Sequence, residues 1–249
     1  MKTCWFVAGP NGAGKSTLAK KYLPPECVEY VNFDEIANRL AVDGSAASGM
    51  AKAGRIALRR IDQLIAEGQS FAIETTLSGR GYLQRVERMK RDGWRVELHY
   101  IFIPSREFSA QRVHLRVENG GHGVPEADIN RRYARSIHNV KEYSRLCDYT
   151  ACYDNSNGEP HFVSIQYGGG NPMVFDQAVY NMIYHCDESG NQSDIDGESK
   201  AALDVFTSSV REQLETYSEQ DANVVVADDE RKPVIKPARV VLDELSRKK

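Results

Sequence analysis

The sequence predicts a three-layer α/β fold, in which a mostly parallel β-sheet lies between helices and a helical tail follows at the C-terminus. Short apolar runs alternate with helical patterns up to about residue 188, which is typical of repeated β–α units. The first apolar run, Thr3–Ala8, leads into a glycine-rich loop that opens a helical segment. A chain of 249 residues with 41% hydrophobic residues can also bury an ample core.

The expected elements follow from apolar spacing and from the glycines and prolines that interrupt it. We expect strands at Thr3–Ala8, Val28–Phe33, Phe71–Glu74, Arg95–Ile103, and an edge hairpin of Tyr149–Tyr153 with Phe162–Tyr167. We expect helices from the first loop to about Tyr22, at Met50–Glu67, Tyr82–Arg91, Asp176–Tyr184, and on both sides of the glycine-rich segment 119–125, the second at Glu126–Leu146. Gly68 and Pro104 mark the ends of the second helix and the fourth strand.

The composition changes at Asp187. Residues 187–198 are rich in Asp, Ser, Gly, Asn and Gln, a composition typical of flexible linkers. Beyond them, five apolar side chains recur at spacings of three and four, on one face of an amphipathic helix within 199–218: Leu203, Phe206, Val210, Leu214 and Tyr217. The sequence therefore predicts a main domain at 1–186, a linker at 187–198 and an accessory tail at 199–249.

Charge and cysteine content limit the possible partners and compartments. The chain has 32 basic and 35 acidic residues, a formal charge of −3, so a generally basic nucleic-acid binder is excluded and a nucleic-acid partner is not expected. No stretch approaches the roughly 20 apolar residues that cross a bilayer, so no membrane partner is expected. Five cysteines without a C-x-x-C pair indicate reduced thiols and a cytoplasmic protein.

The strongest motif follows the first strand. Residues 9–17 are Gly9, Pro10, Asn11, Gly12, Ala13, Gly14, Lys15, Ser16 and Thr17. The first eight fit G-x-x-x-x-G-K-[ST], the P-loop, in the strand-to-helix context that the motif requires. Its backbone N–H groups and the helix N-terminus bind phosphates. We expect Lys15 to reach the β- and γ-phosphates of a nucleoside triphosphate, Ser16 to bind Mg²⁺, and Thr17 to assist.

Other motifs narrow the class of P-loop protein. The base-reading N-K-x-D motif of GTPases is absent, and Asp34-Glu35 follows the second strand rather than a later one, unlike the acidic pair of motor and transporter ATPases. Small-molecule kinases place a carboxylate at the end of the second strand, where strand ends converge on a ligand. We therefore predict Asp34 as the general base for an acceptor hydroxyl. A helix N-cap is the alternative role.

Two further groups of residues are candidates for the site, and the first of them reaches the same edge of the sheet. Glu74, Thr75 and Thr76 end the third strand. Glu74 is expected to bind acceptor hydroxyls or the water around Mg²⁺, and the hydroxyls of Thr75 and Thr76 to bind substrate or backbone, with helix capping as the alternative. Five arginines flank the glycine-rich segment: Arg112, Arg116, Arg131, Arg132 and Arg135. They either close over phosphates as a lid or form a solvated face. His122 is interpreted as structural.

The ordered set of motifs resembles the zeta toxin family. It comprises G-P-N-G-A-G-K-S-T-L, N-F-D-E-I-A, E-T-T-L-S-G, H-Y-I-F-I-P and R-V-x-x-G-G-H-x-V-P-x-x-x-I-x-R-R-Y, spread over about Met1 to Tyr184. The resemblance implies a P-loop kinase that uses ATP or GTP with Mg²⁺ to phosphorylate the 3′-hydroxyl of UDP-N-acetylglucosamine, as the toxin of a toxin–antitoxin system.

By the same resemblance, Lys15 and Ser16 bind nucleotide and Mg²⁺, Asp34 is the base, and Glu74 and Thr76 contact the sugar nucleotide. Arg116 and Arg132 are the best matches to the two arginines that bind phosphate. The resemblance also implies an antitoxin protein as partner, and the helix at 199–218 could be a built-in inhibitor of that kind or an oligomerisation helix. Two other functions stay open: a kinase for another small-molecule or polynucleotide hydroxyl, and a non-catalytic nucleotide-binding regulatory module.

Overall fold

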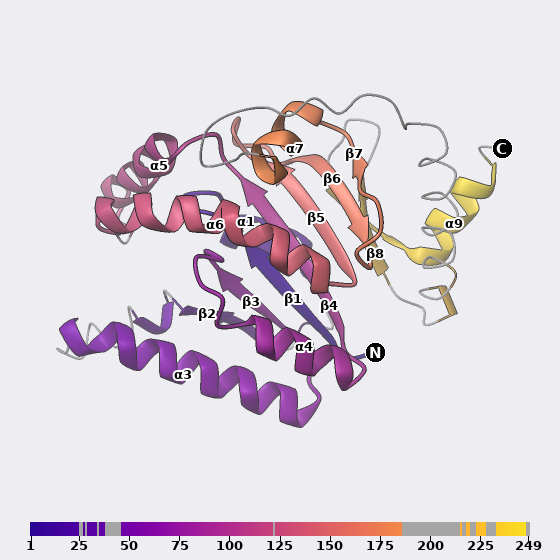
Figure 1. Ribbon diagram of the computed structural model, residues 1–249, viewed down its shortest axis with the longest axis horizontal. Coiled ribbons are helices and arrows are strands. Elements are labelled where there is room, and N and C mark those ends of the chain that lie inside the picture. The colour runs from indigo at the N-terminus through magenta and orange to yellow at the C-terminus, as the bar shows by residue number, and fades with distance from the viewer. Residues whose placement is uncertain are drawn as a thin grey trace.

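The structure, a computed structural model, describes residues 1–24, 27, 29–33, 35–37, 46–121, 123–185, 215, 218–219, 223–227 and 233–247. Within that part of the chain, a seven-stranded sheet has the order β2-β3-β1-β4-β5-β6-β7 (Figure 1). Its strands are β1 (Thr3–Ala8), β2 (Glu29–Asn32), β3 (Phe71–Thr75), β4 (Arg95–Phe102), β5 (Tyr149–Asp154), β6 (His161–Tyr167) and β7 (Met173–Val174). Helices next to it are α1 (Lys15–Tyr22), α3 (Ala46–Glu67), α4 (Leu83–Arg91), α5 (Arg106–Glu118), α6 (Glu126–Leu146) and α7 (Gln177–Tyr184).

The first five strands in chain order are parallel. β1 pairs with β3 on one side and with β4 on the other, β2 pairs with β3, and β4 pairs with β5. β6 and β7 then add antiparallel strands at one end of the sheet. The predicted mostly parallel sheet is confirmed, and β1 lies where the order of strands reverses, the position at which open α/β sheets bind ligands.

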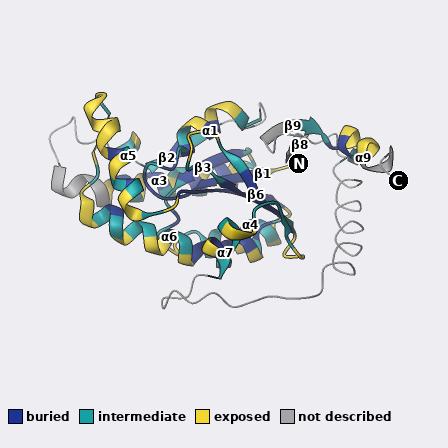
Figure 2. Ribbon diagram, turned by 90° about the horizontal axis from the view of Figure 1, so that it is seen from above, coloured by how far each residue is buried: buried dark blue, intermediate teal, exposed yellow. Residues whose placement is uncertain are grey.

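Alternating side chains of the strands fill one core on each face of the sheet, as the twofold repeat of a strand requires. Phe6 of β1 packs in a cluster with α3, α4, α6 and α7, whereas its neighbour Val7 packs in a cluster with α1. Figure 2 shows α4, α6 and α7 on one face and α1 on the opposite face. The three-layer α/β architecture predicted from the sequence is therefore confirmed.

Helix α3 shows how the sequence pattern selects the buried side of an element. Ala53, Ala57, Ile61 and Leu64 recur at spacings of three and four and are at most 2% exposed, so one face of α3 packs on the sheet beside β2 and β3. The structure starts this helix at Ala46, four residues before the predicted start. The prediction excluded Gly49, although tertiary packing often overrides the low helix propensity of a single glycine.

Other boundaries differ for similar reasons. Phe33 is helical rather than the last residue of the second strand, because β2 ends with Asn32, its last residue paired with β3. The predicted β5–β6 hairpin is present, but β6 is not an edge strand, because β7 pairs along its other side. A two-residue strand such as β7 carries too little alternation to be recognised in a sequence.

The C-terminal tail is not only helical, which corrects the prediction. β8 (Asn223–Ala227) and β9 (Pro233–Pro237) form an antiparallel pair before α9 (Ala238–Arg247). Ala238 and Val241 of α9 are buried in the same cluster as α1, so α9 packs against the main domain. The predicted linker and nearly all of the predicted helix at 199–218 lie outside the described residues. Among the described helices, none is long and apolar enough to cross a membrane.

Candidate functional site

The P-loop joins β1 to α1 in a conformation that needs its glycines. Gly9, Gly12 and Gly14 have φ values of 146°, 74° and 89°, a region that favours glycine. A Cβ on Gly9 would lie 2.3 Å from the carbonyl oxygen of Ile101, so β4 also requires glycine there. The side chain of Lys15 is buried, and its Nζ donates a hydrogen bond of 2.9 Å to the carbonyl of Pro10, which holds the lysine against its own loop.

Two residues from other elements hold the outside of this loop. Ser109 of α5 donates a hydrogen bond of 2.6 Å to the carbonyl of Asn11. Asn155, which follows β5, donates one of 2.8 Å from Nδ2 to the carbonyl of Ala13. Both donors are buried, and they fix the carbonyls of Asn11 and Ala13. Within the loop, the N–H of Gly9 donates to the carbonyl of Thr75 and the N–H of Ala13 to that of Pro10, each at 3.3 Å, so a phosphate site would use the other loop N–H groups.

The start of α1 is suited to phosphate and Mg²⁺. Its N-cap residue is Gly14, which offers no side-chain oxygen to the first-turn N–H groups, and such N–H groups bind anions. Ser16, in the first turn, places a hydroxyl 2.7 Å from the Oε2 atom of Glu74. A hydroxyl and a carboxylate are hard oxygen donors of the kind that Mg²⁺ takes beside phosphate oxygens and water, so these residues fit the ion that the P-loop implies.

Glu74 is the centre of a hydrogen-bond cluster at the ends of β2 and β3. Its Oε2 atom accepts from Ser16, from the Tyr30 hydroxyl and, at 2.9 Å, from Nδ2 of Asn32. Burial and the nearby charge of Glu74 raise the pKa of Tyr30 well above its ordinary value, so the phenol stays a donor at neutral pH. Asn32 also accepts from the N–H of Glu35. These contacts fix the carboxylate of Glu74 beside the P-loop.

A cavity of about 400 Å³ opens next to this cluster. Its lining brings together the P-loop, the ends of β2 and β3, the α3 helix and the start of α6: Lys15, Asn32, Phe33, Gly54, Ala57, Leu58, Glu74, Thr75, Thr76, Ser78, Gly79, Gly81, Tyr82, Arg131, Arg132 and Arg135. Lys15 therefore shares one cavity with Glu74 and with three arginines. The mixture of cationic, acidic and aromatic side chains suits an acceptor with polar groups and a ring.

The arginines of the predicted lid occupy different places. Arg131 and Arg132 both pair with Asp128, at 2.7 and 4.0 Å, at the edge of the cavity. Arg116, on α5, does not belong to the described lining of that cavity. Its side chain packs at Gly121, where an added Cβ would come within 2.6 Å of the arginine Cγ. The two arginines matched by family resemblance are thus separated, Arg132 at the cavity and Arg116 outside its described lining.

Arg112 lies near the P-loop instead. Its Nη2 atom donates a hydrogen bond of 3.3 Å to the carbonyl of Ser156, and its guanidinium lies 4.5 Å from the ring centroid of Phe108. Burial lowers the pKa of Arg112 from its ordinary value. A Cβ on Gly12 would lie 3.0 Å from the Cβ of Arg112, so this arginine and the P-loop are direct neighbours.

The threonines that end β3 shape the cavity wall. Oγ1 of Thr75 accepts a hydrogen bond of 3.0 Å from the N–H of Leu77, and Thr76 shares one of 2.9 Å with Ser78. Leu77 has a φ of 55°, and its carbonyl accepts a bond of 2.8 Å from Asn139 of α6. Strained backbone of this kind persists only where the surroundings hold it, so α6 and the β3 end are fixed relative to each other.

Some site residues differ between the sequence prediction and the structure. Asp34 and His122 lie outside the described residues, so their predicted roles stay predictions. Thr17 is exposed on α1. Sequence reasoning missed Tyr30, Asn32, Ser109 and Asn155. Asn32 and Asn155 could have been found, because each lies at or just after the end of a predicted strand and polar residues there converge on the site. Tyr30 and Ser109 carry no such signal.

Three comparisons place the chain among known proteins. Residues 5–136 match the family model AAA_33, described as an AAA domain. A protein of Haemophilus influenzae (strain ATCC 51907 / DSM 11121 / KW20 / Rd), described as uncharacterized, is 34% identical over 129 residues, which are 51% of this chain and 90% of the relative. The AvrRxo1-ORF1:AvrRxo1-ORF2 structure with sulphate ions is 19% identical, with 99% of this chain and 76% of that chain covered at a TM-score of 0.60.

A second structure of that complex, with ATP, matches at 18% identity and the same TM-score of 0.60, covering 99% of this chain and 76% of that chain. A structure of the PezAT chromosomal toxin–antitoxin system of Streptococcus pneumoniae matches at 18% identity, 86% of this chain, 87% of that chain and a TM-score of 0.49. The AvrRxo1 match supports the α/β fold described above. Since the family model spans the P-loop, the end of β3 and the start of α6, the chain belongs to the AAA_33 family of AAA domains.

Proposed function

We propose that this protein is a kinase that transfers the γ-phosphoryl group of ATP or GTP to the 3′-hydroxyl of UDP-N-acetylglucosamine. One observation carries the proposal: the P-loop lysine Lys15, the carboxylate Glu74 and the arginine Arg132 line a single cavity of about 400 Å³. Phosphoryl transfer needs an aligned acceptor and cations over the transferred group, and little covalent help. A cavity that contacts both the P-loop and polar acceptor ligands meets that need.

Each residue has a defined part in this proposal. The P-loop N–H groups and Lys15 hold the phosphates, and Arg132 stabilises the charge on the transferred group. Ser16 would hold Mg²⁺, with Glu74 binding its water; the ion would neutralise charge on the β- and γ-phosphates. Asp34 accepts the proton of the acceptor hydroxyl. Arg116, outside the described lining of the cavity, keeps its predicted contact with phosphate as part of this proposal.

The acceptor would bind at the β3 end. Thr76 and Glu74 offer hydrogen bonds to hydroxyl groups, and the Tyr82 and Phe33 rings line the same cavity. The hydroxyl of Thr75 already accepts from Leu77, so we assign Thr75 mainly to shaping the wall. The three α6 arginines favour an acceptor that carries negative charge of its own, as the diphosphate of a sugar nucleotide does.

Two further parts of the proposal concern nucleotide and partner. ATP as donor is supported by the similar AvrRxo1-ORF1:-ORF2 structure with ATP. A toxin–antitoxin role is supported by the motif resemblance to zeta toxins. An antitoxin partner is supported by the pairing of AvrRxo1-ORF1 with a second protein. The partner is a separate antitoxin protein, with inhibition by the chain's own tail as the alternative.

The direct test is identification of the phosphorylated product. The protein is incubated with γ-labelled ATP or GTP and with UDP-N-acetylglucosamine, nucleosides, oligonucleotides or small sugars, and the product is located by mass spectrometry and NMR. We expect label on the amino sugar, lost in Lys15→Ala and kept in Lys20→Ala, since Lys20 lies exposed on the same helix. Nucleotide binding without transfer to any acceptor would instead favour a regulatory module. If expression of the Lys15→Ala variant still arrested cell growth, the toxicity would not come from phosphoryl transfer.

A further inference from the structure

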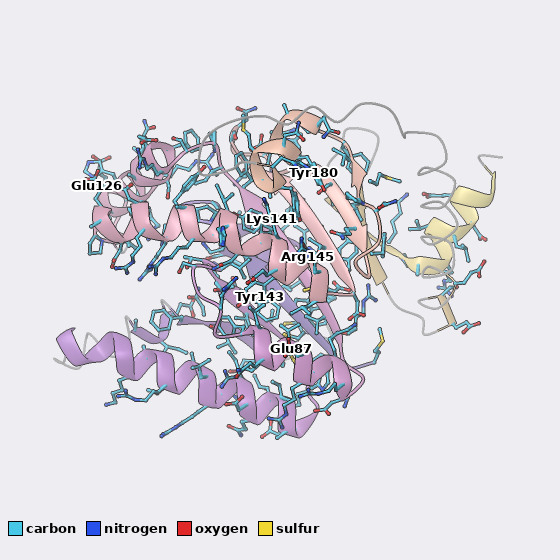
Figure 3. All side chains as sticks on the ribbon, in the orientation of Figure 1. Glu87, Glu126, Lys141, Tyr143, Arg145 and Tyr180 are labelled. Atoms are coloured by element: carbon cyan, nitrogen blue, oxygen red, sulfur yellow. The ribbon has the colours of Figure 1, made fainter. Side chains whose placement is uncertain are left out.

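A second cavity, of about 660 Å³, lies among the start of α5, α6 and α7. Arg135 lines both this cavity and the one that holds Lys15. The floor of the second cavity is apolar, because Phe102 and Ile183 are 2% and 0% exposed and Ile137 packs in the same cluster. Figure 3 labels Lys141 on α6 and Tyr180 on the neighbouring α7. The volume is in the range of sites that hold small organic ligands, roughly 300–1,000 Å³.

The rim of this cavity carries basic side chains of α6. Arg135, His138 and Lys141 follow one another at a spacing of three along that helix, and all three line the cavity. Within the described part of the chain, none of the three makes an ion pair. By contrast, Arg80, a described basic side chain nearby, forms an ion pair with Glu142 of α6. Basic groups that line one cavity without a carboxylate partner among the described residues are available to an anion from outside.

The one carboxylate in the described lining does not oppose this charge. Glu107 accepts a hydrogen bond of 2.8 Å from Nε of Arg106, its neighbour at the start of α5. That bond holds the pKa of Glu107 at about 2, so the residue stays ionised and paired with Arg106 at neutral pH. The Arg106–Glu107 pair is neutral as a whole, which leaves the basic side chains of α6 to set the charge of the cavity.

We propose that this cavity is a second ligand site that binds a small organic phosphate. The phosphate lies among Arg135, His138 and Lys141, and the apolar part of the ligand lies against Ile137 and Met182, lining residues that keep exposed surface. Phosphate oxygens accept several charge-assisted hydrogen bonds at once, and the exposed apolar surface of the lining supplies the remaining contact area. None of the P-loop residues belongs to the described lining of this cavity, which shares Arg135 with the cavity around Lys15.

Calorimetry with a defined probe tests the proposal. The full-length protein is first saturated with Mg²⁺ and ADP, so that the P-loop is filled, and is then titrated with 1-naphthyl phosphate. We expect saturable binding of one equivalent. Inorganic phosphate and 1-naphthol, each with only one half of the probe, should bind about tenfold more weakly or worse. No saturable binding of 1-naphthyl phosphate, or equally tight binding of either half, would overturn the proposal.

Variants locate the binding. The double variant His138→Gln/Lys141→Gln should bind 1-naphthyl phosphate at least about tenfold more weakly, because it loses two of the groups that would hold the phosphate. Neither residue is in the described lining of the cavity around Lys15, so this loss would report on the second cavity. Arg145→Gln removes a charge from the same helix at an exposed position outside the described lining, and affinity should stay within about twofold. Unchanged affinity in the double variant, or an equal loss in Arg145→Gln, would refute the site.

A measurement on the wild-type protein covers the case in which the double variant does not fold. The chain has six histidines. The NMR signal of the His138 ring is identified as the one that is present in the wild-type spectrum and missing from the spectrum of the single variant His138→Gln. Titration of the ADP-loaded wild type with 1-naphthyl phosphate should shift this signal along a saturating curve with the calorimetric Kd. A His138 signal that does not move while the probe binds would place the probe elsewhere and overturn the proposal.

Discussion

Ser16 of the P-loop donates a hydrogen bond of 2.7 Å to the Oε2 atom of Glu74 at the end of β3. The two residues are 58 positions apart in the chain and meet because β1 and β3 are adjacent parallel strands. Tyr30 and Asn32 donate to the same oxygen. The carboxylate that faces the acceptor cavity is therefore tied to the residue that the P-loop motif assigns to Mg²⁺.

Replacement of Glu74 by Gln should lower kcat by about 10²-fold or more, because an amide has one acceptor oxygen fewer for Mg²⁺ water and for the acceptor. ADP affinity measured without Mg²⁺ should change little, since the P-loop backbone remains. The Mg²⁺ concentration that gives half-maximal rate should rise. Glu87→Gln, at an exposed position on α4, is the matched control. A variant with normal kcat and normal Mg²⁺ dependence would remove Glu74 from the mechanism.

Replacement of Asp34 by Asn should lower kcat by about 10²–10⁴-fold, the usual contribution of a general base, while nucleotide binding survives. The adjacent carboxylate provides the control: Glu35→Gln should stay close to wild type, because Glu35 is exposed. Single-turnover rates with a saturating acceptor measure the chemical step directly. If Asp34→Asn turns over as fast as wild type, the residue serves as a helix cap and not as a base.

Gly14→Ala should damage the P-loop in two ways. A left-handed alanine costs about 1–2 kcal/mol, and its Cβ would lie 2.6 Å from Nδ2 of Asn155. We expect a lower Tm and ADP affinity reduced by about tenfold or more. Gly79→Ala is the control, since a Cβ there meets nothing within 4 Å and its φ is not positive.

Adding Asn155→Ala to Gly14→Ala separates the two causes. The double variant loses the close contact but also the bond to Ala13, which is worth about 1 kcal/mol. The two effects on unfolding free energy should therefore be less than additive. Fully additive effects would mean that the Asn155 side chain moves aside without cost and that only the φ of residue 14 matters.

Stability should fall in acid through Glu97, which is buried between Arg95 at 2.5 Å and His99 at 3.3 Å. Burial alone would raise the pKa of this carboxyl, but Arg95 and His99 lower it below its ordinary value. A lowered folded-state pKa adds stability above the unfolded value, about 4.3, and the gain is lost as the pH falls through the folded value.

The Glu97→Gln variant tests that assignment by denaturant unfolding at several pH values. At pH 7 it should be less stable by about 3–5 kcal/mol, because Arg95 is left buried without the charge of Glu97. The difference from wild type should shrink as the pH falls below the unfolded-state value, about 4.3, toward the lowered pKa of Glu97 in the folded protein. Glu126→Gln, exposed on α6, should show neither effect. A difference that stays constant with pH would assign the loss to packing.

The sequence predicted the strands and helices of the main domain to within a few residues, because buried parallel strands read as short apolar runs and helices as apolar stripes. It failed at β7, β8 and β9. β7 has only two residues, and β8 and β9 stabilise each other across a separate two-stranded sheet. Such pairing depends on contacts between segments and leaves little local pattern.

By itself the sequence predicted a phosphate-binding loop at residues 9–16, because glycine spacing, Lys15 and the strand-to-helix context are local properties of that segment. Only the tertiary structure decided which other residues join them. It brought Glu74 and Arg132 to one cavity with Lys15 and placed Arg116 outside the described lining. It also gave Arg135, His138 and Lys141 a shared cavity. The physical reason is that the positions of α5 and α6 are set by their packing against each other and, for α6, against β4, contacts between segments far apart in the chain that no local spacing encodes.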